Sequence, residues 1–149
     1  MAVTCVPVPM NKLLLPTILA GIAGFTLTGC DREPVGDPVA QGRHIVENVA
    51  MCVDCHTPHL PDGRLDPDRM LQGSLLPFAA TVPMPWAPAA PGIAGLPTFT
   101  NDEAAVKFLM SGQTQHGTPL RPPMPSYRMS ETEARAVVAF LRSLKPANG

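Results

Sequence analysis

The chain has 149 residues and a formal net charge of −1, and it contains 19 prolines but only 5% aromatic residues. This length allows one ordinary domain, and the near-neutral charge offers no basic surface for nucleic acid, so that class of partner is excluded. So many prolines exclude a chain built mostly of regular structure, because proline lacks a backbone donor and breaks helix interiors. The low aromatic content predicts a thin core unless another group supplies apolar bulk.

The first thirty residues have the pattern of an export signal. Lys12 supplies one positive charge, an apolar run extends from Leu13 to Leu27, and the sequence LTGC ends the run at Cys30. This ending resembles the lipobox of bacterial lipoproteins, in which the cysteine is acylated and becomes the mature N-terminus. We therefore expect residues 1–29 to be a lipoprotein signal peptide and Cys30 to carry the lipid.

The alternative to cleavage is an uncleaved membrane anchor, and either arrangement tethers the protein to a membrane outside the cytoplasm. Pro16 lies within the apolar run, whose length is near the lower limit for crossing a bilayer, and both features favour cleavage. Asp31 directly after the cysteine resembles an inner-membrane retention signal of enteric lipoproteins. We expect a periplasmic location at the inner rather than the outer membrane, with residues 30–38 as lipidated N-terminus and linker and residues 39–149 as the domain.

The first predicted helix covers residues 38–52 and leads into the sequence MCVDCH. Its apolar residues recur at helical spacing, at Ile45, Val46 and Val49.

Cys52 and Cys55 are the only cysteines of the predicted domain, and His56 follows them directly. A structural zinc site requires about four ligands, and no second cysteine pair is present to supply them. A thioredoxin-like redox pair requires a preceding strand, whereas the preceding segment has helical periodicity. A structural disulfide suits an exported protein but gives no role to the histidine.

The pattern Cys-x-x-Cys-His predicts covalent attachment of one c-type haem. Two thiols three positions apart on a helical turn face the same side, and each can add to one vinyl group of the porphyrin. His56 then lies under the macrocycle, where its imidazole can ligate the iron. The export signal agrees with this prediction, because these thioether bonds form outside the bacterial cytoplasm.

A haem iron with one histidine ligand either takes a second ligand, commonly histidine or methionine, or keeps an open site. Several methionines of the domain have other predicted roles: Met51 is adjacent to the attachment motif, Met70 is packing filler after a polar turn, Met110 belongs to the core, and Met129 is a hydrophobic staple. The histidines His44, His59 and His116 are predicted to be on the surface, with His116 the first substitute if no methionine binds.

Met84 and Met124 remain, and each lies between two prolines. A residue before proline is pushed out of helical geometry into an extended one. A stiff, extended backbone suits a weak ligand, because little conformational entropy is lost when the sulfur meets iron.

The second and third predicted helices cover residues 101–111 and 131–144. Each begins with a predicted capping box, Thr100 with Glu103 and Ser130 with Glu133. The third helix has a clear apolar stripe at Ala134, Val137, Val138, Leu141 and Leu144. No strand pattern persists, so the predicted fold class is all-α, with about three helices and long Pro-rich loops.

The motif CVDCHTP and the later segment RPPMPSYRMSETEARAVVAFLRSL resemble the class I monohaem cytochromes c, particularly the cytochrome subunits and domains of bacterial periplasmic dehydrogenases. The resemblance covers residues 39–145 and implies the small cytochrome c fold around one covalent haem. It implies His56 and Met124 as the axial ligands of the iron. It also implies that the first and last helices cross, with Gly42 receiving Phe140.

With Met124 assigned to iron, Met84 beside Trp86 is predicted to pack, sulfur against ring. The candidate partners of the haem propionates are Arg64, Arg121 and Arg128.

Two protein ligands leave iron no open coordination site, which favours electron transfer over enzymatic chemistry. We expect a membrane-tethered carrier that takes electrons from a dehydrogenase or quinol-oxidising complex upstream and passes them to a terminal oxidase downstream. No general base or nucleophile for a small-molecule substrate is evident. The alternatives are a haem-based sensor or peroxidase-like enzyme with a labile sixth ligand, and a structural lipoprotein whose cysteines form only a disulfide.

Overall fold

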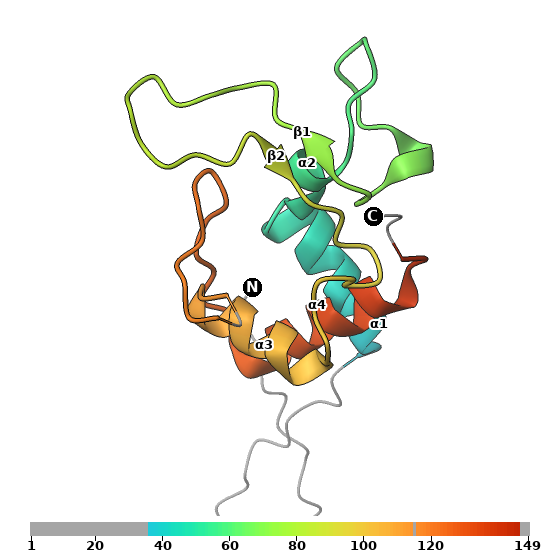
Figure 1. Cartoon of the computed structure of the whole chain (residues 1–149). Helices are drawn as coiled ribbons and strands as arrows, with labels where there is room; N and C mark the ends of the chain where they lie inside the picture. Colours follow the sequence, from blue (N-terminus) through green and yellow to red (C-terminus); the bar gives the residue numbers. More distant parts are fainter. Residues whose placement is uncertain (1–35, 115, 147–149) are drawn as a thin grey trace, which may run out of the picture. The chain divides into compact units, whose positions relative to one another are not determined.

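Two helices from opposite ends of the domain cross at the centre of the fold: α1, Pro38–His44, and α4, Glu131–Ser143 (Figure 1). The computed structural model describes residues 36–114 and 116–146. The predicted signal peptide, Cys30 and most of the predicted linker lie outside these residues. Within the described ranges, none of the helices combines the length and apolar character required to cross a bilayer.

The crossing depends on a glycine. A Cβ atom at Gly42 would overlap the carbonyl group of Ala136 and lie 2.8 Å from Cβ of Phe140, so only glycine allows this approach. The Arg43 guanidinium lies over the Phe140 ring, 5.3 Å from its centroid. The predicted contact of Gly42 with Phe140 is therefore confirmed.

The first helix does not run unbroken to residue 52 as predicted. Asp37 caps α1 by accepting a hydrogen bond from the Val39 amide at 3.0 Å, and the helix then widens into the π-helical segment η1, Ile45–Val49. The backbone turns left-handed at Met51, with φ of 49°. The attachment motif consequently forms a separate short helix, α2, Cys52–His56. Apolar periodicity is similar in α and π turns, so it could not reveal the change.

Helices α3, Asp102–Ser111, and α4 lie close to their predicted bounds. The capping box of α4 is confirmed, since the Ser130 and Glu133 side chains each accept a bond from the other's backbone amide, at 3.3 and 2.8 Å. The box predicted for α3 is wrong. Asn101 caps that helix by accepting from the Ala104 amide at 2.8 Å, because its side chain lies one residue closer to the helix than that of Thr100.

The rest of the chain is mostly loop. A short 3-10 turn, η2, covers Pro67–Arg69. Strands β1, Ser74–Leu75, and β2, Ala89–Ala90, pair antiparallel and close the loop between them. Strands of two residues each give too little alternation to predict from sequence. The fold is predominantly helical, as expected.

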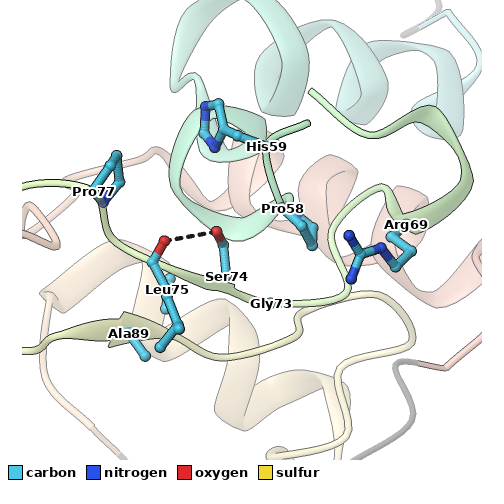
Figure 2. Close-up of a pocket in the computed structure, with 9 residues that line it drawn as sticks. Pro58, His59, Arg69, Gly73, Ser74, Leu75, Pro77 and Ala89 are labelled. Carbon is cyan, nitrogen blue, oxygen red and sulfur yellow. Dashed lines mark hydrogen bonds between the residues drawn. The ribbon is translucent and has the colours of Figure 1, made fainter. Parts of the chain in front are cut away.

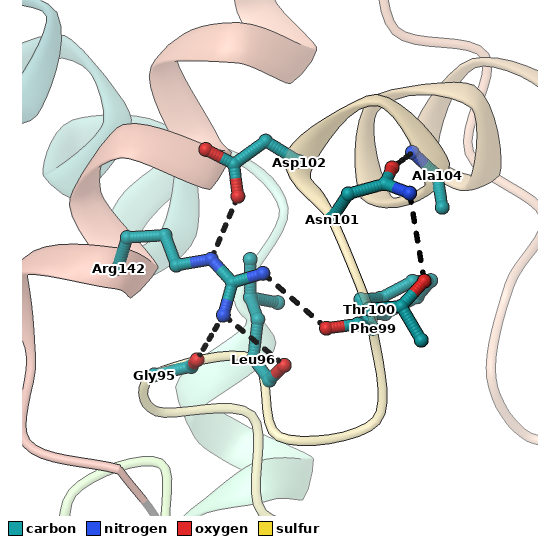
Figure 3. A network of polar contacts seen from close by, with 8 residues as sticks. All are labelled: Gly95, Leu96, Phe99, Thr100, Asn101, Asp102, Ala104 and Arg142. Atoms are coloured by element: carbon teal, nitrogen blue, oxygen red, sulfur yellow. Dashed lines mark hydrogen bonds and ion pairs between the residues drawn. The ribbon is translucent and has the colours of Figure 1, made fainter.

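Arg142 joins α4 to α3 and to the loop before α3 (Figure 3). Its guanidinium donates to the Asp102 carboxylate at 2.7 Å and to the Gly95 carbonyl at 2.7 Å, with longer bonds to two further carbonyls of the same loop. The core beneath is aliphatic, and Phe140 is the one aromatic residue among the buried core residues of the described chain. The protein part of the core is therefore thin in aromatic bulk, as the composition predicted.

Candidate functional site

The two thiols of the attachment motif lie on the single turn of α2. Cys52 is buried and Cys55 is partly exposed, and both are free thiols. Burial raises the pKa of Cys52 to about 11, although a hydrogen bond with the Tyr127 hydroxyl acts in the opposite direction. Burial also raises the pKa of Cys55, with the Asp54 charge adding to the effect. Without an attached haem, both groups are thus protonated thiols at neutral pH.

The His56 imidazole is buried and is held by one hydrogen bond. The side chain is only 5% exposed, and its Nδ1 lies 2.7 Å from the Pro91 carbonyl oxygen. A carbonyl can only accept, so Nδ1 carries the proton and the lone pair is on Nε2. Burial lowers the pKa of the imidazole, with the Pro91 bond opposing that effect, so the ring is neutral at neutral pH. A hydrogen bond to the non-ligating nitrogen fixes the ring in the manner typical of histidine ligands.

The segments that hold Pro91 in place are themselves anchored to the motif. The buried Thr57 hydroxyl accepts from the Leu71 amide at 3.0 Å, and the His56 carbonyl accepts from the Gly73 amide at 2.8 Å. Gly73 has φ of +93°, and a Cβ there would lie 2.7 Å from the Gly92 nitrogen. Residues 71–73 therefore pack directly between the motif and the segment that carries Pro91. Sequence reasoning missed Pro91, since a backbone acceptor 35 residues away leaves no local signal.

Met124 lies half-buried in the loop that precedes α4. The loop accepts a hydrogen bond at the Pro122 carbonyl from the Ala87 amide, at 2.8 Å. At its other end the Tyr127 hydroxyl donates to the Ala50 carbonyl at 2.7 Å. Figure 1 shows this loop in orange beside the yellow-green loop between β1 and β2, as the first of these bonds requires. The second bond attaches the loop to the residue that lies two positions before Cys52.

The other methionines divide between packing and exposure. Met70 packs against the core with its sulfur 4.0 Å from the Thr57 hydroxyl, as predicted, and Met129 also packs against the core. Met51 is 56% exposed. The core role predicted for Met110 is wrong, because its side chain is 40% exposed and the buried face of α3 consists of Ala105, Val106 and Leu109. Met84 is also exposed, at 43%, and its predicted packing against Trp86 finds no support.

Trp86 has a buried indole nitrogen without a hydrogen-bond partner among the described residues. The ring stacks edge-on against Phe78, with 6.0 Å between centroids. Buried N–H groups are rarely left unpaired, so this donor fits a site that receives an acceptor from a bound group. The two thiols and the oriented imidazole of the Cys-x-x-Cys-His turn have the chemistry that covalent attachment of a haem requires.

The charged and histidine candidates are all at the surface. Arg64 donates to Asp62 at 2.8 Å in an exposed pair. Arg121 and Arg128 are exposed, and so are the three remaining histidines, His44, His59 and His116. Among the described residues, no three His, Cys, Asp or Glu side chains form a cluster that could hold a metal ion.

A hollow of about 510 Å³ lies beside the small sheet (Figure 2). Its lining includes Pro58, His59, Arg69 and Leu75, but none of the predicted iron or thioether ligands. Figure 2 shows the Ser74 hydroxyl bonded to the adjacent Leu75 carbonyl, at 2.9 Å, so that polar group is satisfied locally. We do not assign this hollow to the haem.

These features define a small helical protein whose Cys-x-x-Cys-His turn presents two thiols and an oriented imidazole to one prosthetic group. A family model described as Cytochrome c matches residues 39–145. The chain belongs to the cytochrome c family. The family binds haem c covalently, and Cys52, Cys55 and His56 fit its attachment motif. A comparison with curated proteins found no match.

Proposed function

We propose that this protein is a membrane-tethered single-haem electron carrier in which His56 and Met124 are the axial ligands of the iron. Membership of the cytochrome c family supports electron transfer through haem as the general function, outside the cytoplasm, as is typical of these domains. The bound haem supplies one-electron chemistry at iron. The chain's own contribution is to hold the haem, select its ligands and exclude competing ones.

The observation that carries the proposal is the hydrogen bond between His56 Nδ1 and the Pro91 carbonyl, at 2.7 Å. It fixes the tautomer and the ring plane, so Nε2 is left as the ligating nitrogen. The thiols of Cys52 and Cys55 supply the two thioether bonds from the same turn.

Met124 is the proposed ligand on the opposite face. Its loop is bonded at both ends to segments of the frame, at Pro122 and at Tyr127. A thioether ligand raises the reduction potential relative to a second imidazole. If His56 and Met124 both ligate the iron, small molecules would have no free site there, which would suit a carrier rather than an enzyme.

The proposed partners are a dehydrogenase or quinol-oxidising complex as donor and a terminal oxidase as acceptor. Acylation of Cys30 after removal of residues 1–29 would hold the domain at the periplasmic face of the inner membrane. The tether raises the effective concentration of the carrier at membrane-bound partners. A Cys30→Ser variant is expected to move from the membrane to the soluble fraction while keeping its haem.

Absorption spectroscopy of the native holoprotein tests the carrier. We expect the oxidised protein to show the far-red methionine–iron band and the reduced protein not to bind carbon monoxide. Rapid carbon monoxide binding by the native reduced protein would instead support a sensor or a peroxidase-like enzyme with a labile sixth ligand. An intact mass without a haem adduct, after co-expression with the haem maturation machinery, would refute both the carrier and the haem-based alternatives.

A further inference from the structure

Tyr127 is the only tyrosine of the chain, and it lies three residues after Met124. Its side chain is half-buried, and its hydroxyl donates to the Ala50 carbonyl at 2.7 Å across 77 residues of sequence. The same hydroxyl contacts the thiol of Cys52. One side chain of the Met124 loop thus reaches the segment that holds the haem-attachment turn.

The backbone around Ala50 is shaped to present its carbonyl. The Ala50 amide closes the π-helical turn by donating to the Ile45 carbonyl at 2.7 Å. The next residue, Met51, is left-handed, so the helix ends here and α2 begins in a new direction. The last carbonyls of a helix have no partner within it and accept from other groups. Tyr127 supplies the donor for Ala50.

The other anchors of the Met124 loop lead elsewhere. The Pro122 carbonyl is bonded to Ala87, in the loop between β1 and β2, and the Met129 amide donates to Leu109 of α3 at 3.3 Å. Ser126 packs against the left-handed Gly112 at the end of α3, where a Cβ would lie 2.6 Å from Cβ of Ser126. Of these four contacts, only that of Tyr127 ends on the segment adjoining the attachment motif.

We propose that Tyr127 is a positioning residue for Met124, and that its hydrogen bond to Ala50 couples the distal ligand loop to the turn that fixes the haem. The proposal rests on Met124 being the sixth ligand. A haem attached to α2 through two thioethers would be held by that turn, so a loop tied to Ala50, two residues before α2, would keep a fixed distance from the iron. Without the tie, the loop can move away from the haem while its remaining bonds to α3 and to the loop at Ala87 persist. The sulfur then leaves the iron more often, and exogenous ligands gain access.

The test compares Tyr127→Phe with Thr118→Val in the oxidised holoprotein, with imidazole as the probe ligand. Tyr127→Phe removes only the hydroxyl and keeps the ring. The control removes a hydroxyl that is bonded at 2.6 Å to Thr114 in the exposed turn before the Met124 loop, away from the attachment segment. A net hydrogen bond of ordinary strength is lost in both variants. We therefore expect Tyr127→Phe to bind imidazole about three- to tenfold more tightly than wild type and Thr118→Val to bind it unchanged.

Incorporation of 3-fluorotyrosine gives a second measurement that does not depend on how the phenylalanine variant folds. Tyr127 is the single site labelled, and the more acidic phenol is a stronger donor. The fluorinated protein should bind imidazole more weakly than wild type. The two changes act in opposite directions on one bond, which a general loss of stability would not produce.

Each outcome supports or overturns either the positioning role of Tyr127 or the ligand role of Met124. Equal imidazole affinity in wild type and Tyr127→Phe, or an equal increase in the Thr118→Val control, overturns the positioning role, even if the methionine–iron band is present. A wild-type band that survives Met124→Ala refutes Met124 as ligand, and the proposed function's ligand set fails with it. A band lost in Met124→Ala but imidazole affinity unaltered in Tyr127→Phe leaves the carrier intact and removes only this inference.

Discussion

The two Pro-Met-Pro segments of this chain are identical as tripeptides but differ in how the fold holds them. Met84 is exposed in the loop between β1 and β2, whereas Met124 is half-buried in a loop anchored at Pro122, Tyr127 and Met129. Flanking prolines restrict the backbone conformations open to both methionines. The difference teaches that identical tripeptides can be held differently, and the anchors to the helical frame favour Met124 over Met84 as the proposed ligand.

Removing the haem should give the largest effect on both segments. The variant Cys52→Ser with Cys55→Ser cannot form thioethers, and the protein part of the core has few aromatic residues to replace the porphyrin. We expect the domain to unfold, with loss of helical circular dichroism and of a cooperative thermal transition. A haem-free variant that still melts cooperatively at the wild-type temperature would show that the protein core is sufficient alone.

Exchanging the methionines one at a time addresses the comparison directly. Met124→Ala should abolish the far-red band and lower the reduction potential by on the order of 0.1 V, within the range of about 0.8 V that axial ligands cover. Met84→Ala is the matched control and should change neither, because Met84 is exposed and is not the proposed ligand. Redox titration with optical detection measures both quantities. A reversed pattern, with Met84→Ala losing the band, would move the ligand assignment to the other segment.

Crowding the crossing of α1 and α4 should destabilise the helical frame of the domain. Gly42→Ala places a methyl group against the Ala136 carbonyl, which is backbone and can yield only if the helices separate. We expect a loss of about 1–3 kcal/mol in the free energy of unfolding, measured by denaturant titration of the holoprotein. Gly36→Ala is the control, since a Cβ there meets nothing within 4 Å. Equal stability of the two variants would contradict the close crossing.

The sequence predicted those parts of the site that are local in the chain. A Cys-x-x-Cys-His turn and a Ser-x-x-Glu capping box are short patterns, and the resemblance to class I cytochromes c also supplied the approach of Gly42 to Phe140. The sequence could not predict the hydrogen bonds from His56 to Pro91 and from Tyr127 to Ala50. Each joins a side chain to a backbone carbonyl far away in sequence, and any residue can supply a carbonyl. It also misplaced Met110, since the apolar stripe of α3 is narrow and a methionine at its edge has the same periodicity whether it is buried or exposed.

The smallest expected effect is at the start of α4, directly after the Met124 loop. Ser130→Ala removes the side chain that accepts from the Glu133 amide at 3.3 Å. An N-cap serine contributes about 1 kcal/mol to stability, so the free energy of unfolding should fall by about that amount. The far-red band should persist, because the loop anchors at Tyr127 and Met129 remain. A lost band would mean that the cap, rather than those anchors, holds the ligand loop.

The same cap predicts how the free energy of unfolding depends on pH. Hydrogen bonds from the Ser130 hydroxyl and amide hold the pKa of Glu133 below its usual value. A carboxyl whose pKa is lower in the folded state contributes stability above its unfolded pKa of about 4.3, and that stability is lost as the pH falls through the folded value. Glu133→Gln should therefore be less stable than wild type at neutral pH, and the difference should shrink below about pH 4. Denaturant titrations at several pH values measure this, with Glu47→Gln as the control, since Glu47 lies in η1, away from this cap. A Glu133→Gln deficit that stays constant down to acid pH would show that the carboxylate charge takes no part in the cap.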